Sequence, residues 1–261
     1  HISTSGATEE IDMLVGAGYV DRLEVSWHGR EILGLAHCFR RAIEKGIPQP
    51  IQIEDYSNFS MACRYLAGGL GIPFMPTKSL LGSDIAKRST FLGEKKVKTI
   101  DCPFTGEKVA LVPALNPDVT FVQAMRADRE GNVQMWGCIA DTAWALKASK
   151  KVVATVEEIV DNKIIRADPN RTVVPNFKVV AVVEAPYGGH PWHMQGYYDM
   201  DIEFRKMYGE ASRNVETFEK FLDEWVYGVE NHTGYLNKLG AERLLRLKAA
   251  HRPSSSVNYG Y

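Results

Sequence analysis

Short apolar runs alternate with helical patterns over the first two thirds of the 261-residue chain. The apolar runs are rich in β-branched residues and too short for helices, so they predict buried strands. These predicted strands cover residues 22–27, 51–54, 73–76, 109–112, 119–124, 152–156 and 179–184. Helical spacing occupies residues 7–15, 35–45 and 57–70. This order is typical of an α/β fold with an open, mostly parallel sheet covered by helices.

The pattern changes to helices toward the C-terminus. Helical spacing covers residues 202–211, 217–226 and 235–250, and no repeat or low-complexity linker divides the chain. Residues 252–261 include three serines and a proline, which predict a flexible tail. We therefore expect an α/β domain over residues 1–198. C-terminal helices packed on the same domain should follow over residues 199–251.

Composition argues against several kinds of partner. The 31 basic and 32 acidic residues nearly cancel, so no charge excess favours nucleic acid or an anionic membrane. No apolar run reaches the roughly 18 residues that a membrane span needs, and no secretory signature is found. The four cysteines, Cys38, Cys63, Cys102 and Cys138, lack metal-ligand spacing. We expect a cytoplasmic protein with reduced thiols and no metal.

Two short polar stretches are candidate binding positions. Gly82 and Ser83 interrupt an apolar pattern, and such a turn can offer N–H groups and a hydroxyl to an anion. A plain turn that starts a helix is the alternative. Glu54 and Asp55 end a predicted strand, where open α/β sheets place ligands. The alternative there is that Asp55 helps Ser57 to cap the next helix.

Two further features have weaker chemical interpretations. The loop over residues 186–196 contains His190 and His193, but no third ligand has a recognised spacing, so a wall of the substrate mouth or a partner contact is favoured over a metal. Cys138 follows a glycine and is the best candidate for a Cys–His pair, although a buried inert thiol is favoured. No nucleophile elbow, Walker loop or dinucleotide fingerprint is present.

Several stretches, taken in order, resemble the α subunits of class I CoA-transferases of the glutaconate CoA-transferase type. They include SGATEEIDML from residue 5, EDYS from residue 54, GIPFMP from residue 71 and DCPFTGEKV from residue 101. They continue with PDVTFVQAMRADREGNVQMWG from residue 117, VVATVEEI from residue 152, APYGGHP from residue 185 and YLNKLGAER from residue 235. No single stretch is diagnostic, but their order and spacing cover nearly the whole chain.

The resemblance implies a reaction and a partner. Such an α subunit pairs with a β subunit of similar fold, usually in a heterotetramer, and the active site lies between them. The nucleophile is a glutamate of the β subunit, which attacks the acyl-CoA to give an acyl-enzyme anhydride and then a glutamyl-CoA thioester. CoA then passes to a small carboxylic acid, with a dicarboxylic acid favoured. Coenzyme A thioester is a substrate, and no cofactor is bound permanently.

The resemblance also implies roles for individual residues. In the α subunit, one turn is matched by Ser5 and Gly6 and another by Gly82 and Ser83; both would donate hydrogen bonds to a carboxylate or thioester oxygen. The pair formed by Glu54 and Asp55 would position these groups. Arg126 would anchor an acidic group or stabilise the interface with the partner, and the interface is slightly favoured.

The departures from the family pattern leave alternatives open. The relatives begin with a further βαβ unit that carries a Gly-Gly-Phe-type loop, and this sequence has no counterpart. Some members of the superfamily are ring-cleaving acyl-CoA hydrolases, and in that alternative Glu54 or a partner residue would activate water. Others are decarboxylases. A non-catalytic scaffold subunit is the third alternative. The β sequence would separate transfer from the other two reactions, and assays of Ser83→Ala and Glu54→Ala in the complex would identify a scaffold.

Overall fold

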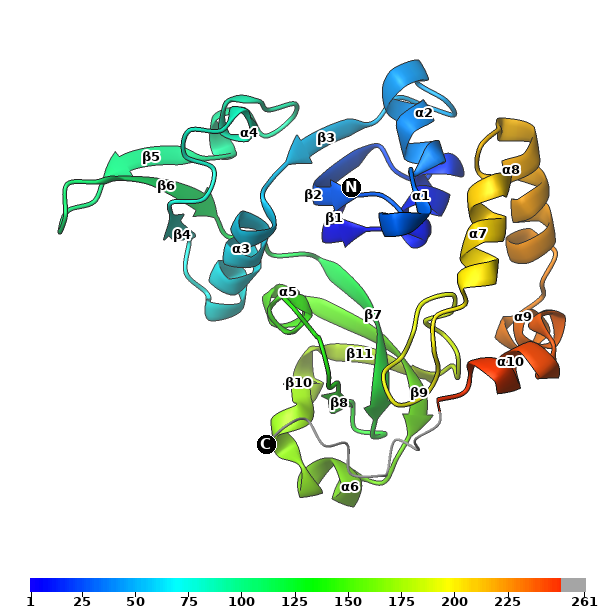
Figure 1. The fold of residues 1–261 in the computed structure, drawn as a ribbon. Helices are drawn as coiled ribbons and strands as arrows, with labels where there is room; N and C mark the ends of the chain where they lie inside the picture. The colour runs from blue at the N-terminus through cyan, green and yellow to red at the C-terminus, as the bar shows by residue number, and fades with distance from the viewer. Residues whose placement is uncertain (250–261) are drawn as a thin grey trace. The chain divides into compact units, whose positions relative to one another are not determined.

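The computed structural model describes residues 1–249, which group into two compact units (Figure 1). Unit 1 contains His1–Asp118, Asp141–Lys150 and Tyr208–Phe218. Unit 2 contains Val119–Ala140, Lys151–Met207 and the described residues from Glu219 onward. The predicted division at residues 198 and 251 stays a prediction, and the predicted tail over 252–261 lies outside the described residues.

The first sheet of unit 1 is fully parallel. Its strands are β1 (Ile2–Ala7), β2 (Arg22–His28) and β3 (Gln52–Asp55), in the order β1-β2-β3. Helices α1 (Glu9–Gly16) and α2 (His37–Lys45) contribute to a core with Val15, Leu23 and Val25. Helix α3 (Asn58–Leu70) packs against β1 and β2. Because the three strands run in one direction, their carboxyl ends meet at one edge.

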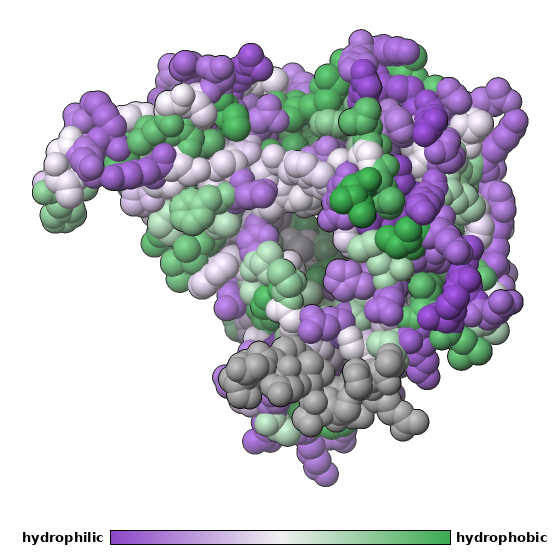
Figure 2. All heavy atoms as spheres, in the orientation of Figure 1, coloured by the Kyte–Doolittle hydropathy of each residue, from purple (hydrophilic) through white to green (hydrophobic). Residues whose placement is uncertain are grey.

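The second sheet of unit 1 is antiparallel, with the order β4-β6-β5. It contains β4 (Phe74–Thr77), β5 (Lys98–Asp101) and β6 (Lys108–Pro113), and the short helix α4 (Asp84–Lys87) and a 3-10 turn (Gly93–Lys95) lie between β4 and β5 in sequence. Apolar residues reach the surface around β5 and β6 (Figure 2). They form part of a shallow groove with Phe74, Ile100 and Phe104 among its lining residues.

Helix α5 (Thr142–Ala148) packs against α3 through two glycines. A Cβ atom on Gly68 would lie 2.9 Å from the Ala148 Cβ and 2.2 Å from the Leu115 carbonyl oxygen, and one on Gly69 would lie 3.0 Å from the Trp144 ring. Any larger side chain at Gly68 would therefore push the backbone aside. This close approach places the start of α5 beside the first sheet.

Unit 2 is built on a five-stranded sheet with the order β10-β8-β7-β9-β11. Strands β7 (Val119–Ala127), β9 (Lys151–Ile159) and β11 (Val179–Glu184) pair in parallel. Strand β8 (Val133–Gln134) pairs antiparallel with β7, and β10 (Thr172–Val174) pairs antiparallel with β8. The predicted hairpin turn after β7 is confirmed, because Asp128 accepts hydrogen bonds from the Glu130 and Asn132 backbone N–H groups. Helix α6 (Asn162–Ala167) follows β9.

Helices α7 (Ile202–Ala211), α8 (Val215–Leu222), α9 (His232–Leu239) and α10 (Ala241–Leu247) end the described chain, and a π-helical turn, Asp223–Tyr227, follows α8. The single helix predicted over 235–250 is wrong. Gly240, with φ of 84° and ψ of 147°, breaks the helical hydrogen bonding and separates α9 from α10. Within residues 1–249, no helix has both the length and the apolar character to cross a membrane.

The predicted α/β class is confirmed. Parallel pairing holds in β1-β2-β3 and in β7-β9-β11, but the strands of the described residues are divided among three sheets. The antiparallel strands β4, β5 and β6 form a sheet of their own, whereas β8 and β10 extend the parallel strands of unit 2 at one edge.

Candidate functional site

The carboxyl ends of β1, β2 and β3 bring several predicted residues to one edge of the first sheet. Thr4 and Asp55 both pair with Val25 in the middle strand, and Gly6 pairs with Trp27. Ser5, Gly6 and Asp55 therefore lie at the same edge, as the parallel arrangement predicts. We call this region the carboxyl edge; it consists of Ser5, Gly6, Ser26, Asp55, Asn58 and Asp141.

Polar side chains are linked directly at the carboxyl edge. The Ser5 hydroxyl donates to a carboxylate oxygen of Asp141. The Ser26 hydroxyl contacts both the Ser5 carbonyl oxygen and the Asn58 side-chain oxygen. Gly6 is exposed, and a Cβ atom built on it would meet nothing within 4 Å. Open space therefore lies beside a cluster of hydrogen-bonding groups.

Serine hydroxyls link the start of α3 to Ser79, which precedes the second predicted turn in sequence. Ser57 caps α3 by accepting from the Ser60 N–H at 3.1 Å, and its hydroxyl lies 2.5 Å from that of Ser79. The Ser83 hydroxyl donates to the Leu80 carbonyl at 2.7 Å, and Gly82 has φ of 75°. The sequence suggested that Ser57 and Asp55 together cap α3; in the structure the side-chain cap is provided by Ser57. The Ser83 hydroxyl is used within its own turn, at the start of α4.

Glu54 is completely buried at the end of β3. Its carboxylate accepts hydrogen bonds from the Ser89 hydroxyl (2.8 Å) and from the N–H groups of Thr90, Phe91 and Leu92 (2.9, 3.3 and 2.8 Å). Burial alone would raise the pKa of this carboxyl, but the donated hydrogen bonds outweigh it and hold the pKa below its usual value. The charge is therefore used to hold the segment after α4 in place.

Glu54 belongs to a buried charged layer. The Lys96 ammonium lies 3.6 Å from the Glu54 carboxylate and 5.5 Å from the centre of the Tyr56 ring. Arg64 lies 4.1 Å from the same ring centre and is paired with the buried Glu24. Burial lowers the pKa of Lys96, and the neighbouring Glu54 charge opposes this shift. Two cations thus share one aromatic ring, each with its own carboxylate.

Residues 1–185 match the family model described as Coenzyme A transferase. The chain belongs to this family. The prediction of a CoA-transferase-type enzyme is thereby confirmed at the level of the family. The more specific resemblance, to one of the two chains of glutaconate-type CoA-transferases, is confirmed by two relatives.

Both of these CoA-transferase relatives are A subunits. The chain is 38% identical over 228 residues to the A subunit of 3-oxoadipate CoA-transferase from Pseudomonas knackmussii, a match that spans 87% of this chain and 78% of the relative. It is 36% identical over 249 residues to the A subunit of glutaconate CoA-transferase from Acidaminococcus fermentans, spanning 91% and 77%. The crystal structure of the latter organism's glutaconate CoA-transferase superposes with a TM-score of 0.87 at 35% identity, covering 93% of this chain and 80% of that one.

Arg126 lies in unit 2, whereas the other predicted site residues of this CoA-transferase-family chain lie in unit 1. Its Nε donates to the Gln134 side-chain oxygen at 2.8 Å, and its guanidinium carbon lies 5.3 Å from the centre of the Trp136 ring. Arg171 lies 5.0 Å from the same ring centre. These contacts hold the β7–β8 hairpin, and the role predicted for Arg126 stays a prediction.

The histidine-containing loop after β11 is held in place by hydrogen bonds of His190. The His190 ring is buried and lies between the Tyr235 hydroxyl (2.6 Å) and an Asp201 oxygen (3.1 Å). Burial lowers the pKa of His190 even though Asp201 acts to raise it. His193 is exposed, and within residues 1–249 no group of three potential ligands could hold a metal ion.

The cysteines are all free. Burial raises the pKa of Cys38 to about 12, so this thiol stays protonated and inert. Cys63 is also buried, which raises its pKa. Cys138 is exposed, contrary to the interpretation of a buried thiol, because it lies in an irregular loop directly after Gly137 with φ of 80°.

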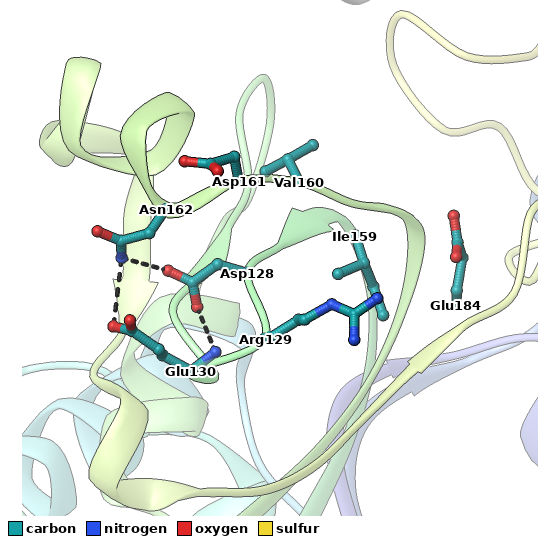
Figure 3. A pocket seen from close by; sticks show the side chains of 8 residues that line it. All are labelled: Asp128, Arg129, Glu130, Ile159, Val160, Asp161, Asn162 and Glu184. Atoms are coloured by element: carbon teal, nitrogen blue, oxygen red, sulfur yellow. Dashed lines mark hydrogen bonds between the residues drawn. The ribbon is translucent and has the colours of Figure 1, made fainter.

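A pocket of about 430 Å³ opens at the carboxyl ends of β7, β9 and β11 (Figure 3). Asp128, Glu130, Asp161 and Glu184 contribute carboxylates to its lining, against the single guanidinium of Arg129. Asn162 donates to Asp128 and to Glu130. An excess of negative charge makes this pocket unsuitable for the phosphates of a CoA molecule.

Sequence reasoning missed three members of the carboxyl edge: Ser26, Asn58 and Asp141. Ser26 is the penultimate residue of the strand predicted over residues 22–27, and this position near the carboxyl end was the only available signal. Asn58 follows the helix cap directly, where polar residues are expected for local reasons. Asp141 is 136 residues from Ser5 in sequence, so no spacing could have connected them.

Proposed function

We propose that this chain is one subunit of a two-chain CoA-transferase that moves CoA between an acyl-CoA and a small dicarboxylic acid. The observation that carries the proposal is 36–38% identity, over most of the chain, to the A subunits of two CoA-transferases. Both relatives are named for dicarboxylic acids. The open, hydroxyl-rich carboxyl edge is a suitable wall for a carboxylate or a thioester carbonyl.

In this proposal Ser5 and Gly6, together with the Gly82–Ser83 turn, line the acyl pocket. Asp55 is exposed at the same edge, and the strand register places its side chain with Thr4, on the face of the sheet opposite to that of Ser5. Glu54 is a positioning residue, because its carboxylate is buried and already accepts four hydrogen bonds. A carboxylate in that state has no free face with which to attack a thioester.

The attacking group is therefore assigned to a glutamate of the partner subunit. One of its oxygens adds to the thioester carbonyl and the C–S bond breaks, which gives an acyl-glutamyl anhydride and CoA thiolate. The thiolate then attacks the glutamyl carbonyl and releases the first carboxylate, leaving glutamyl-CoA. The acceptor carboxylate repeats these steps in reverse. CoA acts as a substrate in each of these steps, and the steps involve no other cofactor.

One face of the unit 2 sheet is suited to bind that partner. Phe121 pairs with Val153, which pairs with Ala181, so these side chains lie on one face of β7, β9 and β11. Phe121 is 77% exposed, and Val119 and Val183 on the same face are 42% and 49% exposed. An uncovered apolar sheet face of this kind marks a protein interface.

Phe121→Glu should prevent co-purification of this chain with the partner subunit. Burying the introduced carboxylate against the partner, without a counter-charge, would cost more than the interface gains. Size-exclusion chromatography of the two co-expressed chains measures the outcome. Tyr19→Glu, at a position 68% exposed in unit 1, is the matched control and should assemble normally. Normal assembly of the Phe121 variant would show that this face is not the interface.

Covalent trapping tests the chemistry. The co-purified complex is incubated with acyl-CoA and treated with hydroxylamine or borohydride, and both chains are analysed by mass spectrometry. We expect one modified glutamate, on the partner subunit, with this chain left unmodified. The same result is expected with Glu54→Gln, provided that the complex still assembles. Modification of Glu54, or of any other residue of this chain, would contradict the proposal.

A further inference from the structure

Asp141 is a helix-capping residue whose side chain does not cap. It directly precedes α5, and its backbone carbonyl accepts the first helical hydrogen bonds, from Trp144 and Ala145 at 3.0 Å. An aspartate at this position normally accepts a hydrogen bond from the first-turn N–H groups. The Asp141 carboxylate makes no such bond and contacts Ser5 instead. The Asp141 side chain therefore does not cap α5 but contacts Ser5, a residue far away in sequence.

Ala140, the residue before Asp141, has an unusual backbone conformation. Ala140 has φ of 43°, in the left-handed region that a residue with a Cβ atom adopts only at a cost. The packing of α5 on α3, through Gly68 and Gly69, fixes the start of the helix from the other side. The left-handed backbone at Ala140 and the close packing of α5 on α3 together fix the position of Asp141 at the carboxyl edge.

The contact limits what Ser5 can do. A serine hydroxyl has one proton, so Ser5 cannot donate to Asp141 and to a ligand oxygen at the same time. An ionised carboxylate is a stronger acceptor than a neutral oxygen, so the Ser5 hydroxyl donates to Asp141 until a competing carboxylate arrives. The same Asp141 charge repels that competitor.

We propose that Asp141 is a specificity-determining residue that holds the Ser5 hydroxyl in the absence of substrate, so that the carboxylate of the acceptor acid binds only by displacing it. The inference rests on the proposed function, in which Ser5 donates to that carboxylate. In this inference, Asp141 weakens the binding of every carboxylate. The correct acid binds nevertheless, because its other contacts with the site offset the lost binding free energy. Discrimination then comes from a repulsive element as well as an attractive one.

The test uses Asp141→Asn in the complex with the partner subunit. Asparagine caps a helix as well as aspartate does and still offers Ser5 an oxygen, so the fold is preserved. The KM for glutaconate, the acid named for one relative, should fall by about fivefold, since a neutral acceptor competes less and the repulsion is removed. Asp118→Asn is the matched control: it removes one charge from an exposed ion pair with Lys150 and should leave KM unchanged.

A second variant separates a direct effect through Ser5 from a general effect of charge. In a Ser5→Ala background, Asp141→Asn should lower the KM for the acid by clearly less than in the wild-type background, because the contested hydroxyl is absent and only the relief of charge repulsion remains. A KM that rises or stays unchanged in Asp141→Asn would overturn the inference. So would a fall in KM of the same size in the Ser5→Ala background. Thermal melting of each variant checks that folding is intact.

Direct binding distinguishes failure of the inference from failure of the proposed function. Calorimetric titration of glutaconate into the wild-type complex and the same variants requires no turnover. A complex that binds the acid with the predicted pattern but transfers no CoA would refute the proposed function and leave the role of Asp141 supported. A complex that transfers CoA without the pattern would refute the role of Asp141 alone.

Discussion

Replacing Glu54 with alanine should lower the free energy of unfolding by about 3–5 kcal/mol, the cost of breaking a buried ion pair by removing one partner. The variant leaves the Lys96 ammonium buried without its carboxylate, 3.6 Å away in the native chain. It also removes the acceptor for three backbone N–H groups in residues 90–92. Urea unfolding, followed by circular dichroism at pH 7, measures the loss.

The effect should depend on pH in a defined direction. The pKa of Glu54 is lowered in the folded chain, so its stabilising contribution is complete above the unfolded pKa of about 4.3. The contribution is lost as pH falls through the lower, folded pKa, where the native carboxylate takes up its proton. The difference in unfolding free energy between wild type and Glu54→Gln should therefore shrink as pH falls below about 4.

Glu107→Ala is the matched control for Glu54. Glu107 is exposed and pairs at the surface with Lys78 at 2.7 Å, so its loss should leave the unfolding midpoint close to that of wild type. Equal midpoints for the two variants would contradict the structural role of Glu54. A catalytic Glu54 would instead leave stability intact and abolish turnover, so measurement of both quantities separates the two roles.

Sequence reasoning located the edge of the first sheet but not the direction of its side chains. Parallel strands end at one edge, so the position of Asp55 at the end of β3 followed from the order of the elements. Ser5, at the end of β1, was singled out only by the resemblance to CoA-transferase α subunits. Of the adjacent pair Glu54 and Asp55, only one can face a cleft. Which one depends on tertiary packing: Glu54 faces inward because Lys96 and residues 89–92 supply its partners.

The remaining differences also arise from contacts that sequence spacing does not encode. The Ser83 turn was correctly placed before a short helix, but the use of its hydroxyl by Leu80 depends on the local backbone geometry. The helix predicted over 235–250 followed apolar periodicity and overlooked Gly240, whose positive φ ends α9. The contact of Asp141 with Ser5 joins two segments that only the folded chain brings together.

Separated from its partner, this chain should transfer CoA at no more than about one-thousandth of the rate of the complex, because the group expected to attack the thioester lies on the other chain. Removing a nucleophile costs at least this much when the rest of the site is intact. Steady-state transfer from an acyl-CoA to glutaconate, measured with each chain alone and with the two mixed, tests the expectation.

Two variants of the complex show which chain supplies the group whose absence lowers the transfer rate. Replacing the attacking glutamate of the partner subunit with glutamine should reproduce the low rate of the isolated chain while the complex remains assembled. Ser5→Ala on this chain should change the rate far less, since it removes one hydrogen bond of roughly 0.5–1.5 kcal/mol and leaves the nucleophile in place. If the isolated chain turned over at the full rate, its own carboxylates would have to supply the attack. Asp55 would then be the first to replace, because it is exposed at the carboxyl edge, whereas the Glu54 carboxylate is buried and already hydrogen-bonded.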